Sequence, residues 1–305
     1  MTPQTAPRQE NLPLGIGLVL LSYIGFTMID SSAKWLGRAG IPSAEYIFIR
    51  YAVHFGLITA ILLPRRGRAL VTTHNFRVEL VRALLLLGST ICNFFAVQFL
   101  PLTVTGAIAF TMPLILCALS VPLLGEPVGW RRWTAIVVGF LGVLVIVHPG
   151  TAAFQPAALA SLAGATCSAL YFITTRRLAG VDSASTQQFY AALISMLGVA
   201  PFAFGQWLWP TLPLDWFFLG LIGIAGLSGH WIFSAALRYA PATTLAPFAY
   251  FQIVYAILSS WFIFQQPPDI WIFLGVPIVI GSGLYIWLRE RKLNRETVTE
   301  VTTQD

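Results

Sequence analysis

Residues 96–127, AVQFLPLTVTGAIAFTMPLILCALSVPLLGEP, align without a gap with residues 236–267, ALRYAPATTLAPFAYFQIVYAILSSWFIFQQP. Each copy reads as an apolar run, a proline break, a second apolar run and a second proline break. The offset is about 140 residues, and the same order of runs and breaks extends over about 84–147. The identical pairs are Ala96 with Ala236, Pro101 with Pro241, Thr103 with Thr243, Ala109 with Ala249, Ser120 with Ser260 and Pro127 with Pro267. The chain is therefore expected to consist of two related halves.

The composition indicates a protein that is embedded in a lipid bilayer. Apolar residues make up 57% of the chain and charged residues 10%, and the mean hydropathy is +0.76. A soluble domain usually carries about 25% charged residues, so this chain cannot cover a surface that faces water. In a bilayer, helices satisfy their own backbone hydrogen bonds, and a span needs roughly 20 mostly apolar residues. The sequence therefore predicts an all-α integral membrane protein.

Ten stretches meet the requirement for a membrane span. They are about 12–36, 43–63, 78–99, 102–124, 130–148, 156–177, 185–208, 215–237, 242–264 and 268–288. They occupy nearly the whole chain and leave no room for a soluble catalytic domain, and neither a GxxxxGK[ST] nor an HExxH motif is present. We predict a cytoplasmic tail at 1–11, a five-helix repeat at 12–148, a second at 156–288 and a cytoplasmic tail at 289–305.

The net charge of +6 has a topological explanation, so we expect no nucleic-acid partner. With a cytoplasmic N-terminus, nearly all basic residues fall on the cytoplasmic side, which is the positive-inside pattern. These are Arg8, Arg65, Arg66, Arg68, Arg77, Arg82, Arg131, Arg132, Arg176, Arg177, Arg238, Arg289, Arg291, Lys292 and Arg295. Both termini are then cytoplasmic, and the protein is expected in a bacterial-type inner membrane as a multi-pass protein.

The three cysteines and the histidines do not form a pattern for metal or disulfide chemistry. Cys92, Cys117 and Cys167 all fall inside apolar spans, so we interpret them as small core residues. We expect no metal site and no cofactor.

Ionisable side chains inside the first two spans are the strongest functional signal. Tyr23, Thr27, Asp30 and Lys34 share one helix face, because they recur at spacings of four, three and four. Asp30 matches Arg50 of the second span in depth, and Lys34 matches Glu45, which predicts two ion pairs. An unpaired charge at this depth would cost about 2.5–3.5 kcal/mol. The pairs are either a structural clamp or part of a substrate or proton path.

Each predicted half holds five spans, an odd number, so the second half enters the membrane from the opposite side. The fold is then ten transmembrane helices in two inverted five-helix repeats. Inverted repeats are typical of secondary transporters, whose substrate sites lie near the midplane between the repeats. The sequence therefore predicts alternating access of a small molecule across the membrane.

The chain resembles the drug/metabolite transporter superfamily, EamA type, over all ten spans. The resemblance rests on the paired halves, on Asp30 and Lys34 followed by Arg50, on the Pro101–Thr103 turn, on residues 124–127 (LGEP) and on Gly139 with Gly142. The second copy has Gln265–Gln266 where the first has Gly125–Glu126.

The resemblance implies that spans one to four and six to nine surround a central cavity. The polar and aromatic residues expected to line it are Tyr23, Thr27, Asn93, Phe110, Ser168, Tyr171, His230, Ser234, Tyr250, Gln252 and Tyr255. Any one of them has an alternative role in packing, but buried polar groups in lipid are costly and tend to be functional.

The substrate expected from these residues is a small, partly apolar metabolite. The candidate cavity lacks a cluster of cations, which argues against phosphorylated substrates. Export of aromatic and other neutral amino acids is the first hypothesis, and transport of a flat vitamin or nucleoside-like metabolite is the second. His230 and Asp30 are the candidates for proton coupling, His230 because its unperturbed pKa lies near 6.5. Uncoupled export would need neither.

Two other classes of function are less compatible with the sequence. A membrane enzyme would need a nucleophile, base or metal cluster near one face, whereas the cytoplasmic connections carry arginines without paired carboxylates or histidines. A scaffold has no need of two mirrored halves. The sequence leaves the oligomeric state open, and a monomer is compatible with it.

Overall fold

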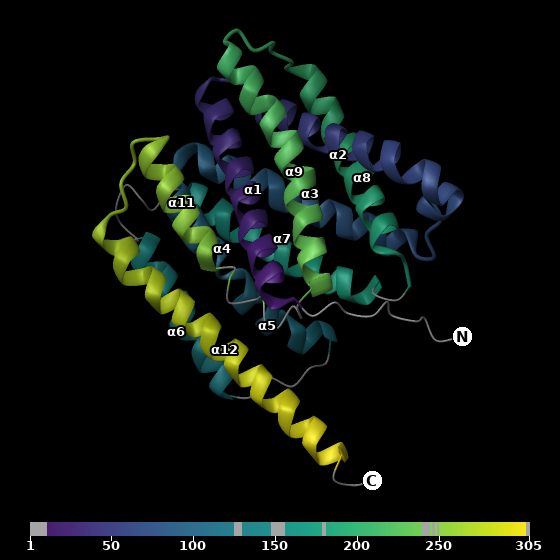
Figure 1. The fold of residues 1–305 in the computed structure, drawn as a ribbon. Coiled ribbons are helices and arrows are strands. Elements are labelled where there is room, and N and C mark those ends of the chain that lie inside the picture. Colours follow the sequence, from purple (N-terminus) through teal and green to yellow (C-terminus); the bar gives the residue numbers. More distant parts are fainter. Residues whose placement is uncertain are drawn as a thin grey trace.

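The computed structural model describes residues 11–124, 130–147, 156–178, 181–239, 245, 248 and 250–302. Every regular element in these ranges is helical (Figure 1). The elements in the first part of the chain are α1 (Leu12–Arg38), α2 (Ser43–Arg66), the 3₁₀ turn η1 (Gly67–Leu70), α3 (Phe76–Phe99), α4 (Leu102–Ala109), α5 (Met112–Leu124) and α6 (Trp130–Val147). Those in the second part are α7 (Pro156–Leu178), α8 (Ala184–Gly205), α9 (Pro213–Tyr239), α11 (Phe251–Phe262) and α12 (Ile270–Thr302).

Eight helical stretches in the described ranges are long and apolar enough to cross a membrane. Two shorter apolar helices, Trp133–Ile146 and Phe251–Phe262, lie where two further spans were predicted. The prediction of an all-helical fold is confirmed for the described residues. The Gly125–Glu126 pair and most of residues 240–249 lie outside the described ranges.

Side-chain caps fix where three helices begin. Asn11 accepts a hydrogen bond from the backbone N–H of Leu14 at the start of α1, and Asn75 caps α3 in the same way. Ser183 accepts from the N–H of Thr186 at the start of α8. Such caps satisfy backbone donors that have no partner inside the helix, which lets short connections join long helices.

Two predicted boundaries differ from the structure. The predicted span 102–124 is interrupted at Phe110–Thr111, between α4 and α5. The reason is Pro113, which has no N–H to donate to the carbonyl of Ala109. At the other end of the chain, α12 continues through the predicted polar tail to Thr302, because residues 289–302 contain neither glycine nor proline.

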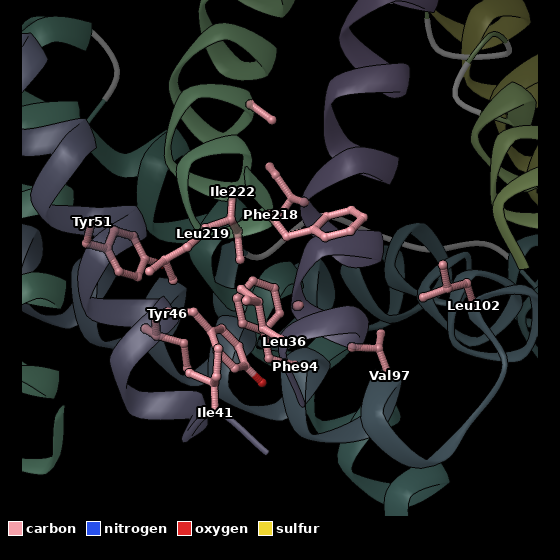
Figure 2. Packing of buried hydrophobic residues seen from close by; sticks show 14 of the residues in the cluster. Leu36, Ile41, Tyr46, Tyr51, Phe94, Val97, Leu102, Phe218, Leu219 and Ile222 are labelled. Atoms are coloured by element: carbon pink, nitrogen blue, oxygen red, sulfur yellow. The ribbon is translucent and has the colours of Figure 1, made fainter. Parts of the chain in front are cut away.

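The helices pack in pairs that join the two halves of the chain. α1 lies against α9, α3 against α7, α2 against α8, and α6 against α12. The last pair runs along one edge of the bundle (Figure 1). The largest apolar cluster fills the junction of α1, α2, α3 and α9, where Ile222 of α9 faces Tyr51, Phe94 and Leu36 (Figure 2).

Candidate functional site

A group of polar side chains lies at mid-length of α1, α2 and α3, where these helices meet α9. Asp30 of α1 accepts a hydrogen bond of 2.8 Å from the side-chain amide of Asn93 on α3. Arg50 of α2 donates a long hydrogen bond of 3.5 Å to the hydroxyl of Thr90, one turn from Asn93. Arg50 is also close enough to Asp30 for electrostatic attraction. The central cluster is defined as Asp30, Arg50, Asn93, Thr90, Phe26, His54 and His230.

Aromatic rings and imidazoles complete the central cluster on its α9 side. The rings of His54 and His230 stack with centroids 6.3 Å apart, and the ring of Phe26 lies 5.0 Å from that of His230. The Arg50 guanidinium lies 5.5 Å from the ring centroid of Phe94. The central cluster thus holds one carboxylate, one guanidinium and several flat rings.

Glycines let α9 approach the other helices closely at this level. A β-carbon on Gly25 would lie 3.2 Å from the α-carbon of Gly229. A β-carbon on Gly226 would lie 3.4 Å from the Arg50 side chain. Small residues at a crossing allow close helix packing in lipid, and here they bring α9 against the charged residues of α1 and α2.

The two predicted ion pairs are replaced by other contacts. Within the part of the chain that the structure describes, the acid–base pairs closer than 4.0 Å are His74–Asp182 and Glu79–Arg82, so Asp30 and Arg50 interact only at longer range. Lys34 instead donates to the backbone carbonyls of Val97, at 3.0 Å, and Leu100.

Glu45, the predicted partner of Lys34, accepts from the backbone N–H of Leu208 at 2.9 Å. The physical reason is that α3 ends beside Lys34, and the last carbonyls of a helix have no partner in the helix itself. They compete successfully with a carboxylate for the lysine. The prediction of a Lys34–Glu45 pair is therefore wrong for this structure.

The remaining predicted cavity residues divide among several contacts. Thr27 donates to the carbonyl of Tyr23 within α1, and Tyr23 packs edge-on against Phe26 and Phe233. Ser168 shares a hydrogen bond of 2.6 Å with Ser89 between α7 and α3. These contacts lie within α1, between α1 and α9, and between α7 and α3.

Phe110 and Tyr250 meet each other, with ring centroids 5.2 Å apart. They occupy equivalent places in the sequence repeat. The Tyr250 hydroxyl also contacts Gly283 of α12, so this side chain points toward the edge of the bundle. Gln252 and Tyr255 are half-buried on α11, and the side chain of Ser234 lies outside the described part of the structure.

Tyr171 was predicted to line the cavity, but in the structure it belongs to a second group of polar side chains around Arg82. Its hydroxyl accepts a hydrogen bond of 2.8 Å from Arg82, in the first two turns of α3. The residues expected to line the cavity do not include Phe26, His54 or Thr90, although His54 is one of the few ionisable residues expected near it. His54 lies one turn from Arg50 and Phe26 one turn from Asp30, so extending each helix face by a turn would have found both.

Surface hollows lie away from the central cluster. One of about 390 Å³ runs between α6 and α12, beside Trp130 and Tyr285, and another of about 330 Å³ lies between Ser43 of α2 and Phe202 of α8. In the described ranges no three His, Cys, Asp or Glu side chains gather as a metal site. The central cluster offers charge pairing and ring stacking.

One protein family matches both halves of the chain. The EamA-like transporter family matches residues 13–148 and, a second time, residues 155–288. The chain belongs to the EamA-like transporter family. It is therefore a multi-pass membrane transporter, of the bacterial inner-membrane type, and not an enzyme.

Several relatives of this EamA-like chain have named substrates. The S-adenosylmethionine uptake transporter of Rickettsia bellii is 30% identical over 92% of this chain and 95% of its own. The riboflavin transporter of Vibrio cholerae is 26% identical over 91% and 94%, and the pseudopaline exporter CntI of Pseudomonas aeruginosa 26% identical over 88% and 95%. A crystal structure aligns with a TM-score of 0.63 over 92% of this chain and 98% of the other, at 18% identity, which shows a shared fold.

Proposed function

We propose that this transporter moves a metabolite that combines an amino-acid zwitterion with a flat ring, and that S-adenosylmethionine uptake is its function. The observation that carries the proposal is the central cluster. Asp30 and Arg50 present opposite charges near each other without being bonded to each other. A bound α-ammonium group would pair with Asp30 and a bound α-carboxylate with Arg50.

The flat part of such a substrate also has partners in the central cluster. Phe26, His54 and His230 present rings on the side of the two charges that faces α9. Rings of this kind stack on a purine, and buried aromatic pairs contribute about 0.5–1.5 kcal/mol beyond the area they bury. The relatives named as S-adenosylmethionine uptake transporters support this substrate, because it carries both an adenosine and an amino acid.

Export of aromatic amino acids is the second candidate. The same pair of opposite charges suits any zwitterionic amino acid, and the ring-lined side of the cluster suits an aromatic side chain. Riboflavin has no such zwitterion, so it makes less use of Asp30 and Arg50.

We propose further that the chain crosses the membrane ten times, as two inverted five-helix repeats with both termini in the cytoplasm. The two segments matched by the family and the pairing of α1 with α9 and α3 with α7 support this arrangement. The helix break at Phe110–Thr111 and the start of α11 after Tyr250 also fall at equivalent positions of the repeat. Interrupted helices beside the repeat interface are typical of transporter substrate sites.

Counterflow in proteoliposomes tests the substrate. Vesicles are loaded with unlabelled S-adenosylmethionine, and entry of labelled S-adenosylmethionine is followed with unlabelled tryptophan, threonine or riboflavin outside as competitors. We expect wild-type protein to take up labelled S-adenosylmethionine. Asp30→Asn is expected to lower the affinity for this substrate by about 10- to 100-fold, because a charge-assisted hydrogen bond contributes about 1.5–3 kcal/mol.

The matched control is Arg65→Gln, which removes a charge from an exposed position at the end of α2. It should leave counterflow unchanged. If wild-type protein exchanges labelled tryptophan but not S-adenosylmethionine, the amino-acid hypothesis replaces the first one. If Asp30→Asn exchanges as fast as wild type at every concentration, the central cluster is not the binding site.

A further inference from the structure

A second polar network joins α3, α7 and α8 at the ends of these helices. Arg82 of α3 is 1% exposed, and its guanidinium donates four hydrogen bonds. It donates 2.8 Å hydrogen bonds to the hydroxyls of Thr175 and Tyr171 on α7 and to the carbonyl of Gln187 on α8. Arg82 thereby ties the first family-matched segment to the second.

The charge on Arg82 is balanced by Glu79, one turn earlier on the same helix. One carboxyl oxygen of Glu79 lies 3.3 Å from the guanidinium, and Glu79 is fully buried. The other carboxyl oxygen has no hydrogen-bond partner. A buried oxygen of this kind has an open position for a proton.

The network lies toward the side of the membrane that is rich in arginine. Glu79 stands in the first turn of α3, Tyr171 and Thr175 in the last two turns of α7, and Gln187 in the first turn of α8. Arg65, Arg66, Arg68, Arg77 and Arg177 flank these helix ends. By the positive-inside pattern this is the cytoplasmic end.

Asp182 is a second carboxylate near Glu79, and it already has hydrogen-bond partners. Asp182, in the connection before α8, repels Glu79 electrostatically. Burial raises the pKa of Asp182, but hydrogen bonds from the Thr73 hydroxyl and from the backbone and ring of His74 outweigh it and lower the pKa overall. Asp182 is therefore held in its ionised form.

We propose that Glu79 is the proton-binding residue that couples transport to a pH gradient, with Arg82 as the latch that it controls. This rests on the proposed transport function and orientation. A proton from the cytoplasm adds to the unpartnered oxygen of Glu79 and neutralises it. Arg82 then loses the one carboxylate that is bonded to it in a dry site, so the junction of α3, α7 and α8 opens to let water reach the guanidinium.

The first test separates exchange from gradient-driven transport. Labelled S-adenosylmethionine is measured in proteoliposomes both as counterflow at equal pH and as net movement driven by a pH gradient. Glu79→Gln is expected to retain counterflow within about twofold and to lose at least 10-fold of the gradient-driven rate, since it can no longer exchange a proton. A purely structural Glu79 would lower both rates together, which would overturn the proposal.

Glu45→Gln is the matched control. Glu45 is also fully buried with one unpartnered carboxyl oxygen, but its other oxygen is bonded to a backbone N–H and not to an arginine. It should keep the gradient response. Loss of that response in Glu45→Gln, with the response intact in Glu79→Gln, would also overturn the proposal.

A second measurement does not depend on the substrate. Cys92 and Cys167 are half-buried at the interface of α3 and α7, deeper in the membrane than Arg82. Labelling by an impermeant maleimide from the cytoplasmic side is expressed relative to denatured protein labelled at the same pH, because acid itself slows thiol chemistry. This relative labelling should rise several-fold when wild type is acidified. In Glu79→Gln the relative labelling should be high at every pH. No rise in wild type would refute the latch, whether or not S-adenosylmethionine proves to be the substrate.

Discussion

Replacing Gly25 with alanine tests the close crossing of α1 and α9 behind the central cluster. A β-carbon at Gly25 lies 3.2 Å from the α-carbon and 3.6 Å from the nitrogen of Gly229, and 3.7 Å from the carbonyl oxygen of Ala225. All three are backbone atoms, so no side-chain rotation relieves the contact and the helices must separate. Overpacking of this kind costs about 1–3 kcal/mol.

Gly220→Ala provides the reference, because a β-carbon at this α9 position meets open space. Both substitutions gain a similar helix propensity, about 1 kcal/mol in water, so their difference isolates the crowding. We expect Gly25→Ala to unfold about 3–8 °C below Gly220→Ala in a thermal melt of the purified protein. Equal melting temperatures would refute the close crossing.

Further predictions concern the two ends of the bundle. Lys34→Met is expected to lower stability by about 2–3 kcal/mol in the same melt, because it leaves the carbonyls of Val97 and Leu100 without their charged donor. An unchanged melting temperature would show that water replaces the lysine. Asp182→Asn should lower stability at neutral pH, since the folded state lowers the pKa of this carboxyl. That contribution is fully present above the unfolded pKa of about 3.9 and is lost as the pH falls through the folded value. Melts from about pH 6 to about pH 3 should therefore lose their acid-dependent part in Asp182→Asn, and an unaltered profile would contradict the assignment.

Sequence periodicity predicted the position of the charged residues but not their partners. Spacing placed Asp30 and Arg50 on the inward faces of their helices at a common depth, and the structure brings them into one cluster. It did not reveal that Asn93 reaches Asp30 first, since that depends on how α3 packs between α1 and α2. Lys34 likewise bonds to the carbonyls at the end of α3, and the sequence pattern carries no information on such backbone acceptors.

The interruption between α4 and α5 had a signal that was available in the sequence. Pro113 stands in the middle of a 23-residue apolar run, and a proline there removes a helix hydrogen bond. No signal in the sequence indicated where Tyr171 would lie. The helix face of Tyr171 is compatible with a central cavity. Arg82, near the start of α3, instead donates a hydrogen bond to the Tyr171 hydroxyl. A buried arginine attracts any hydroxyl within reach, because each of its donors needs an acceptor.

The sequence repeat allows the residues of the Arg82 network to be compared with the equivalent residues at the other end of the transporter. At the repeat offset, Arg82 of α3 corresponds to Ile222 of α9, and Gln187 of α8 corresponds to Ile47 of α2. Ile222 and Ile47 belong to the buried apolar cluster, of which Figure 2 labels Ile222. At these equivalent positions the first end therefore has a charged network and the second has hydrocarbon contacts. Separating the helices at Arg82 hydrates a guanidinium, whereas separating them at Ile222 exposes apolar surface, so a proton on Glu79 acts on the first contact and not on the second.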